Sequence, residues 1–209
     1  MDYQTLLVRP VQLLLISDSK RFKSHSDMLV VIEQAMLGGV DTVLLREKHL
    51  DSAKLLALAS ALRALTNKHH VRLMIHSQAD IAKAVNADGV HVDSASITEI
   101  SSIKAWFETP VLVSASCHHE EELKAAEQQG ADFVFLSPVF PTQSHPGAPS
   151  LGADEFQRLS QSVGIPVIAL GGISSENLKQ LQGAGIATMG GILDTSNPKL
   201  AATQLLTTA

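Results

Sequence analysis

The chain alternates short apolar runs with helical patterns along its length. Most of the apolar runs are continuous, which is typical of parallel strands covered on both faces. Eight such units, without a change of composition between them, predict a single α/β domain over residues 1–209 whose parallel sheet closes into a (βα)8 TIM barrel. The predicted strands are Val11–Ile16, Thr42–Arg46, Val71–Ile75, Gly89–Val92, Val111–Ser114, Asp132–Ser137, Val167–Leu170 and Gly185–Met189.

Two of the helical patterns are the clearest. The segment from Met28 to Leu37 follows the cap candidates Ser26 and Asp27. After the second predicted strand, leucines at 3-4-3 spacing follow Asp51 and Ser52. These leucines are Leu55, Leu58, Leu62 and Leu65.

An open doubly wound sheet is the competing fold. The first unit, however, lacks the G-x-G-x-x-G turn of that fold, and the predicted strands are too many and too similar in strength.

Composition excludes several classes of protein. At 209 residues and 45% hydrophobic content the chain can bury a full core. A net charge of −5 without a Lys/Arg cluster argues against a nucleic-acid partner. No apolar run approaches the roughly 18–20 residues of a membrane span, and the first residues do not resemble a signal peptide. A single cysteine, Cys117, cannot form an internal disulfide. We therefore expect a cytoplasmic protein without a membrane partner, with a homo-oligomer left open.

Glycines end the seventh and eighth predicted strands. The apolar run Val167–Leu170 leads into Gly171, Gly172 and Ile173, and the last strand leads into Gly190 and Gly191. Such corners expose backbone N–H groups to an anion, and late strands of a (βα)8 barrel commonly hold a phosphate there. A Gly-Gly pair alone is more often a tight turn. Because of their place in the barrel, we predict that these five residues bind a phosphate group.

Polar and cationic residues follow other strands. Because the carboxyl ends of parallel strands meet at one face of a barrel, these side chains are expected to line one pocket. Each alone is equally well explained as a surface ion pair or a structural hydrogen-bonding group, so the prediction depends on their joint placement. The sequence predicts a pocket for a small phosphorylated molecule. Its predicted binding residues, besides the glycine corners, are Arg46, Lys48, His76, Ser116 and Thr142.

Several blocks of the sequence match one known family in the family's own order. On these blocks the chain resembles the family of thiamine phosphate synthases and thiazole tautomerases over nearly its whole length. The resemblance implies the same (βα)8 barrel and a phosphorylated thiazole-type substrate. The blocks are Leu15–Asp18, Gly39–Lys48, Ala79–Ala82, Ala87–His91, Gly130–Val134, Ser137–Thr142 and Pro166–Ile173.

The chain departs from the synthase pattern where that pattern holds a metal. In synthases, an Asn-Asp pair after the third strand and an Asp beyond the fourth hold the pyrimidine and the Mg²⁺ of its diphosphate. The matching positions here are His76-Ser77 and Ser96. Since Mg²⁺ prefers carboxylate oxygens, this removes most of the charge that would hold it. Asp93 lies nearby; we expect it to cap the turn into the next helix, and restoration of the metal site by Asp93 is the alternative.

Two further departures favour the tautomerase branch. Leu44 replaces a glutamine of the synthases, and His145 replaces a lysine. A synthase must stabilise a departing diphosphate with cations and metal, and the loss of the lysine removes one such cation. Tautomerases of the family need no metal and move a proton with a histidine shortly after the fifth strand. His118 takes that position, so the leading hypothesis is a metal-independent, cofactor-free isomerase with His118 as its catalytic residue. As alternatives, His118 caps the helix 120–129, or His119 is the active histidine.

Two other functions stay open. One is a thiamine phosphate synthase, a transferase, with a diverged site that still uses Mg²⁺. The other is a non-catalytic protein that binds thiazole phosphate or thiamine phosphate. Metal dependence separates the synthase from the tautomerase, and turnover separates both enzymes from a binding protein.

Overall fold

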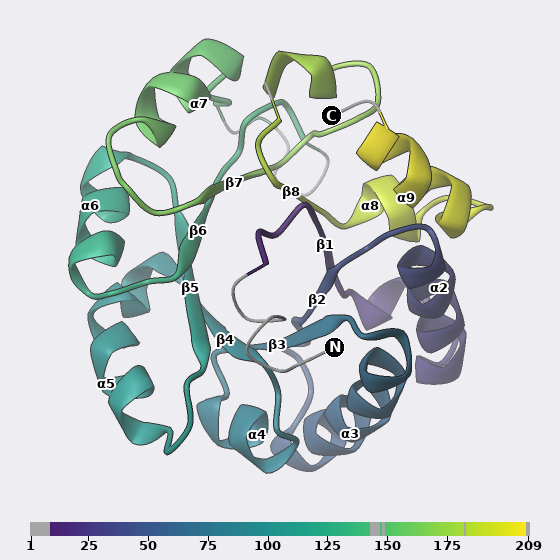
Figure 1. The fold of residues 1–209 in the computed structure, drawn as a ribbon. Helices are drawn as coiled ribbons and strands as arrows, with labels where there is room; N and C mark the ends of the chain where they lie inside the picture. The colour runs from purple at the N-terminus through teal and green to yellow at the C-terminus, as the bar shows by residue number, and fades with distance from the viewer. Residues whose placement is uncertain (1–8, 143–146, 148, 182, 208–209) are drawn as a thin grey trace.

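Eight parallel strands form a closed barrel in sequence order and helices surround it (Figure 1). The computed structural model describes residues 9–142, 147, 149–181 and 183–207. Leu14 of the first strand pairs with Thr42 of the second and with Ala187 of the last, which closes the sheet. The predicted (βα)8 barrel is confirmed. Its strands are β1 (Leu13–Ile16), β2 (Thr42–Leu45), β3 (Arg72–His76), β4 (Gly89–Val92), β5 (Leu112–Cys117), β6 (Phe133–Leu136), β7 (Val167–Leu170) and β8 (Ile186–Thr188).

The helices lie outside the strands, and none in the described part of the chain is both long and apolar enough to cross a membrane. The 3₁₀ helices are η1 (Ser19–Arg21), η2 (Ser94–Glu99) and η3 (Leu178–Leu181). The α-helices are α2 (His25–Leu37), α3 (Ser52–His69), α4 (Ala79–Ala84), α5 (Ile100–Trp106), α6 (Glu120–Gln128), α7 (Ala153–Ser160), α8 (Gly190–Leu193) and α9 (Pro198–Thr207).

Helix caps follow the sequence in one case and differ from it in another. The Asp51 side chain accepts a hydrogen bond from the Lys54 N–H and caps α3 as predicted. The cap of α2 is Ser24, two residues before the predicted Ser26, because the Ser24 hydroxyl accepts from the Asp27 N–H. After β7 the expected α-helix is only the short 3₁₀ helix η3.

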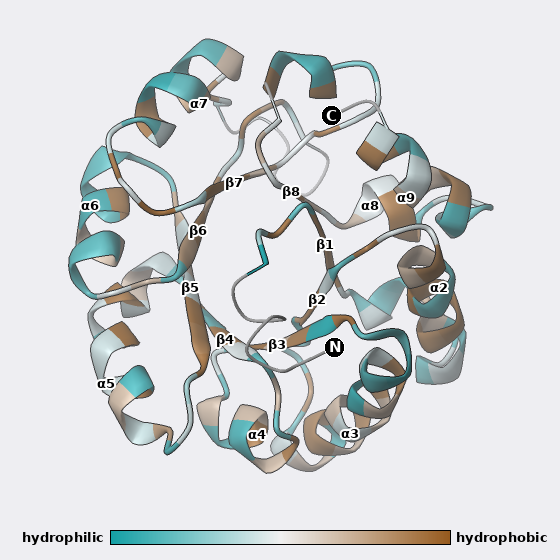
Figure 2. Ribbon diagram, in the orientation of Figure 1, coloured by the Kyte–Doolittle hydropathy of each residue, from teal (hydrophilic) through white to brown (hydrophobic). Residues whose placement is uncertain are grey.

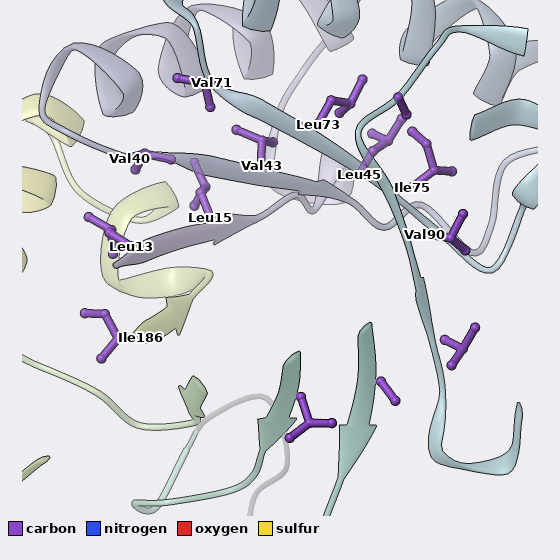
Figure 3. Packing of buried hydrophobic residues seen from close by; sticks show 14 of the residues in the cluster. Leu13, Leu15, Val40, Val43, Leu45, Val71, Leu73, Ile75, Val90 and Ile186 are labelled. Carbon is purple, nitrogen blue, oxygen red and sulfur yellow. The ribbon is translucent and has the colours of Figure 1, made fainter. Parts of the chain in front are cut away.

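Side chains of the strands alternate between two apolar layers. Leu13 and Leu15 belong to the layer between the strands and the helices (Figure 3), whereas Leu14 and Ile16 belong to a cluster that includes no helix residue and so fills the barrel. Leu44, which replaces the glutamine of the synthases, is 1% exposed in this inner cluster. Figure 2 shows hydrophobic strands at the centre and hydrophilic residues gathered on the surrounding helices.

Three aspartates close the base of the barrel. Each directly precedes an even-numbered strand, accepts a hydrogen bond from a backbone N–H of the preceding odd-numbered strand, and pairs with a cation. This repeated link fixes the amino-terminal ends of the strands, so that their carboxyl ends form the open mouth. The links are Asp41 to Leu13 N (3.3 Å) and Arg72 Nη2 (3.0 Å), Asp88 to Leu73 N (2.8 Å) and Arg63, and Asp132 to Val113 N (2.7 Å) and Lys104 Nζ (2.9 Å).

We expect Asp41→Ala to lower the free energy of unfolding by about 3–5 kcal/mol, because it leaves the buried Arg72 guanidinium without its ion-pair partner. Asp132→Ala is the matched control, since its pair with Lys104 is about one-third exposed; we expect a loss of only about 1–2 kcal/mol. Urea unfolding of both variants measures the difference. Equal losses would show that burial of the Asp41–Arg72 ion pair does not increase its contribution to stability.

Candidate active site

The carboxyl ends of β2, β3 and β4 bring two predicted binding residues, Lys48 and His76, together around Asp93. Lys48 Nζ lies 2.8 Å from Asp93 Oδ2, and His76 Nε2 lies 3.5 Å from the same oxygen. Partial burial raises the pKa of Asp93, but the hydrogen bond from Lys48, the neighbouring His76 and the charges of Lys48 and Arg46 outweigh it and lower the pKa below its ordinary value. Asp93 is therefore an ionised carboxylate at the mouth. Asp93 takes the predicted N-cap position of η2, but its side chain makes no cap hydrogen bond and faces Lys48 and His76 instead.

Glu47 holds the loops after β1 and β2 together. Its side chain is 1% exposed and accepts hydrogen bonds from Ser17 Oγ (2.6 Å), Ser19 N (3.0 Å) and Ser19 Oγ (2.7 Å). Ser17 Oγ in turn accepts from the Arg46 N–H at 2.9 Å. Glu47 thus fixes the backbone that carries Arg46 and Lys48. Glu47 was assigned no role from the sequence, although a charged residue directly after an apolar strand indicates a position at the mouth of the barrel.

Two histidines lie side by side below the charged cluster. His91 is 2% exposed, and its Nδ1 and Nε2 lie 2.8 Å from Ser114 Oγ and 2.9 Å from Ser116 Oγ. Its ring stacks on Phe135 at 4.4 Å between centroids. Burial lowers the pKa of His91 to about 3 and that of His76 to about 4, so both rings are neutral near pH 7. Ser116, predicted as a ligand residue, therefore also orients His91, a histidine that the sequence analysis did not select.

This burial predicts a pH dependence of stability. The ordinary pKa of both imidazoles is 6.5, so between pH 6.5 and about 4 the unfolded chain binds more protons than the folded protein. The free energy of unfolding should therefore fall as the pH is lowered through this range, by up to about 1.4 kcal/mol per pH unit for each histidine.

Urea unfolding at pH 7, 5.5 and 4.5 tests this dependence, and His91→Gln should show a shallower fall than the wild type. His118→Gln serves as the control because its side chain is half-exposed, and it should keep the wild-type slope. An unchanged slope in His91→Gln would mean that His91 is not held neutral by burial.

The two glycine corners adjoin at the ends of β7 and β8. A Cβ added to Gly191 would lie 3.7 Å from the carbonyl oxygen of Ile173. Among the described residues, the N–H groups of Gly171, Gly172, Ile173, Gly190 and Gly191 find no backbone or side-chain acceptor. Five backbone donors are thus available at one place.

Gly172 has a second reason to be glycine. Its φ is +66°, and a Cβ there would lie 2.3 Å from the carbonyl oxygen of Pro141. The tight-turn explanation of this glycine therefore also holds, because the loop after β6 approaches it closely. A larger side chain at Gly172 would displace that loop, so Gly172 variants cannot separate ligand binding from folding.

The remaining predicted residues lie at the mouth but apart from the charged cluster. His118 follows β5 and is half-exposed; its Nδ1 and its backbone N–H both contact Glu122 Oε2, at 3.0 and 2.6 Å. The cap residue of α6 is His119, and its side chain makes no cap hydrogen bond. Thr142 lies in the loop after β6, and His145 lies outside the described residues.

A metal ion would find few ligands in this part of the molecule. The described residues contain no group of three or more His, Cys, Asp or Glu side chains that could hold a metal ion. Ser77 follows β3, and the Ser96 hydroxyl donates to Glu99 at 3.1 Å. The carboxylate that the mouth offers between Lys48 and His76 is that of Asp93.

Comparisons with known proteins point to one family. The family described as thiamine monophosphate synthase matches residues 13–193. A putative thiamine-phosphate synthase 2 of Aquifex aeolicus is 40% identical over 177 residues, which cover 85% of this chain and 93% of the relative. A thiamine-phosphate synthase of Alkaliphilus oremlandii is 35% identical over 196 residues, 92% of this chain and 93% of the relative. A solved structure of thiamine phosphate pyrophosphorylase from Pyrococcus furiosus superposes with a TM-score of 0.83 at 27% identity, covering 95% of both chains.

These relatives contradict the tautomerase interpretation. They carry synthase names at 35–40% identity over most of the chain, and they support the synthase alternative instead. That prediction was wrong because the acidic residues were compared with the synthase pattern one position at a time. It treated Ser77 and Ser96 as a lost acidic site, and it assigned Asp93 to a helix cap although that carboxylate faces Lys48 and His76.

Proposed function

The chain belongs to the thiamine monophosphate synthase family, and we propose that it forms thiamine phosphate from a pyrimidine diphosphate and a thiazole phosphate. In this reaction the carbon–oxygen bond to the diphosphate breaks and the diphosphate leaves with the electron pair, while the thiazole nitrogen supplies the pair for the new carbon–nitrogen bond. The observation that carries the proposal is the cluster of Lys48, Asp93 and Arg46 beside an independent set of anion donors at the glycine corners.

Arg46 and Lys48 are proposed to bind the diphosphate. Preorganised cations stabilise the negative charge that develops on a leaving group, and Arg46 is fixed at its backbone by Ser17 and Glu47. Lys48 contacts both carboxylate oxygens of Asp93, at 3.1 and 2.8 Å, so its ammonium group is already at the cluster. A positive mouth therefore receives the most negative part of the substrates.

Asp93 is proposed to hold the Mg²⁺ that the family resemblance implies. Mg²⁺ commonly binds through one or two carboxylates together with substrate phosphates and water, so a single carboxylate fits it when a diphosphate is present. Asp93 is ionised and nearly half exposed, which leaves its oxygens accessible. When bound there, the ion would neutralise charge on the departing diphosphate.

His76 is proposed to contact the pyrimidine. It takes the position of an asparagine that holds the pyrimidine in the synthases. Burial keeps its ring neutral, and a neutral imidazole, like an amide, offers one donor and one acceptor. Its Nδ1 is buried without a hydrogen-bond partner among the described residues. The orientation of the ring is therefore set by Nε2, which faces Asp93.

The glycine corners are proposed to bind the phosphate of the thiazole. The N–H groups of Gly171, Gly172, Ile173, Gly190 and Gly191 supply uncharged donors there. Two anionic groups then bind at separate places on one mouth, and the reacting carbon and nitrogen meet between them. Holding both reactants in this way contributes to the rate by proximity.

The test is thiamine phosphate formation from both substrates with Mg²⁺. The wild type should form the product, and Asp93→Asn should lower kcat/KM by about a hundredfold and raise the Mg²⁺ concentration needed for half-maximal rate. Glu99→Gln, which removes the carboxylate at the end of η2, the helix that follows Asp93, is the control and should act like the wild type. Absence of product with the wild type would refute the proposed function.

His118 should be dispensable for this reaction. Its ring is half-exposed and contacts Glu122 in the first turn of the following helix, α6, rather than the charged cluster. We expect His118→Gln to keep thiamine phosphate formation within about threefold of the wild type, because a general acid–base group would contribute about 10²–10⁴-fold. A loss of that larger size would show that His118 takes part in the chemistry.

A further inference from the structure

We propose that Arg21 binds the phosphate of the thiazole substrate and that Asp194 holds the Arg21 guanidinium at the glycine corner until the phosphate replaces it. The inference deepens the proposed function, on which it rests for the location of the phosphate. Neither Arg21 nor Asp194 was among the residues predicted from the strand ends, and neither lies in the sequence blocks that match the family.

Arg21 connects the carboxyl ends of two neighbouring strands, β1 and β8. It ends η1, which follows β1, and its Nε donates to Asp18 Oδ2 at 2.9 Å. Its Nη1 contacts both carboxylate oxygens of Asp194, and its Nη2 lies 3.5 Å from Met189 Sδ. Met189 packs against the apolar cluster inside the barrel. The guanidinium therefore lies directly beside the last glycine corner.

Asp194 lies where an anion at this corner would lie. A Cβ added to Gly190 would be 2.7 Å from Asp194 Oδ2 and 3.7 Å from Arg21 Nη1. The Asp194 carboxylate thus gives Arg21 the two-oxygen contact that a phosphate also provides, next to backbone donors that lack an acceptor among the described residues. A phosphate bound there would repel this carboxylate, and Asp194 is 55% exposed, so its side chain can turn into water.

Gly190 leaves room for this pair. A Cβ at this position would lie 2.7 Å from Asp194 Oδ2, so a larger side chain would push the carboxylate away from Arg21. With glycine here, the guanidinium is a charged side-chain donor directly beside the backbone donors of the corner. Asp18 keeps Arg21 in place when Asp194 moves away.

The experiment compares thiamine phosphate with thiamine, which differ in the phosphate alone, by calorimetric titration. Arg21→Met should weaken binding of thiamine phosphate by about 10–100-fold, because it removes a charge-assisted hydrogen bond, and change thiamine binding less than twofold. Lys20→Met, the loss of a neighbouring exposed cation, is the control and should change neither. Unchanged binding of thiamine phosphate to Arg21→Met, or an equal loss for both ligands, would overturn the proposal.

Asp194→Asn tests the exchange. It should strengthen thiamine phosphate binding several-fold, and this gain should disappear in the Arg21→Met background, since the carboxylate competes with phosphate for Arg21. Weaker or unchanged binding to Asp194→Asn would overturn the exchange. Wild-type protein that binds thiamine phosphate no better than thiamine would overturn the whole proposal. These titrations need no turnover, so their failure is distinct from a failure to form thiamine phosphate.

Discussion

The buried carboxylate of Glu47 is the interaction on which both ends of the site depend. It accepts hydrogen bonds from Ser17 and Ser19, the first residues after β1, while its own backbone joins Arg46 to Lys48 after β2. Because η1 starts at Ser19 and ends at Arg21, the same carboxylate positions the turn that carries the cation beside β8. One side chain with 1% exposure therefore sets the relative position of the proposed diphosphate and phosphate sites.

Two sets of carboxylates in this barrel differ in burial. Asp41 and Asp88 at the base, and Glu47 at the mouth, are at most 4% exposed and are bonded to backbone N–H groups. Moving them would leave buried donors unsatisfied, so they are fixed parts of the fold. Asp93 and Asp194 are 45% and 55% exposed. Water can take the place of their partners, so these two carboxylates can exchange a cation with a substrate.

The sequence was sufficient for the fold but insufficient for the chemistry. Continuous apolar runs predicted all eight strands to within about two residues at each end, apart from β5, which continues to Cys117. A parallel barrel then brings strand ends to one mouth, so Arg46, Lys48 and His76 could be grouped from order alone. The position of Asp93 at the start of η2 was predicted, but not the role of its side chain, because a cap carboxylate and a site carboxylate look alike in sequence. The contact between Arg21 and Asp194 joins residues 173 positions apart, and no local pattern reports such a contact.

The two exchangeable carboxylates have a common physical effect. In the free protein Asp93 holds Lys48 and Asp194 holds Arg21. The lysine and arginine side chains are long and would otherwise sample many rotamers. Ordering such a side chain costs up to about 2 kcal/mol, and a residue already ordered by a carboxylate loses less when a phosphate group replaces that carboxylate. Each pair also keeps the cation partly neutralised while no anion is present. A mouth that binds two anionic reactants can thus be preorganised without leaving Lys48 and Arg21 unpaired.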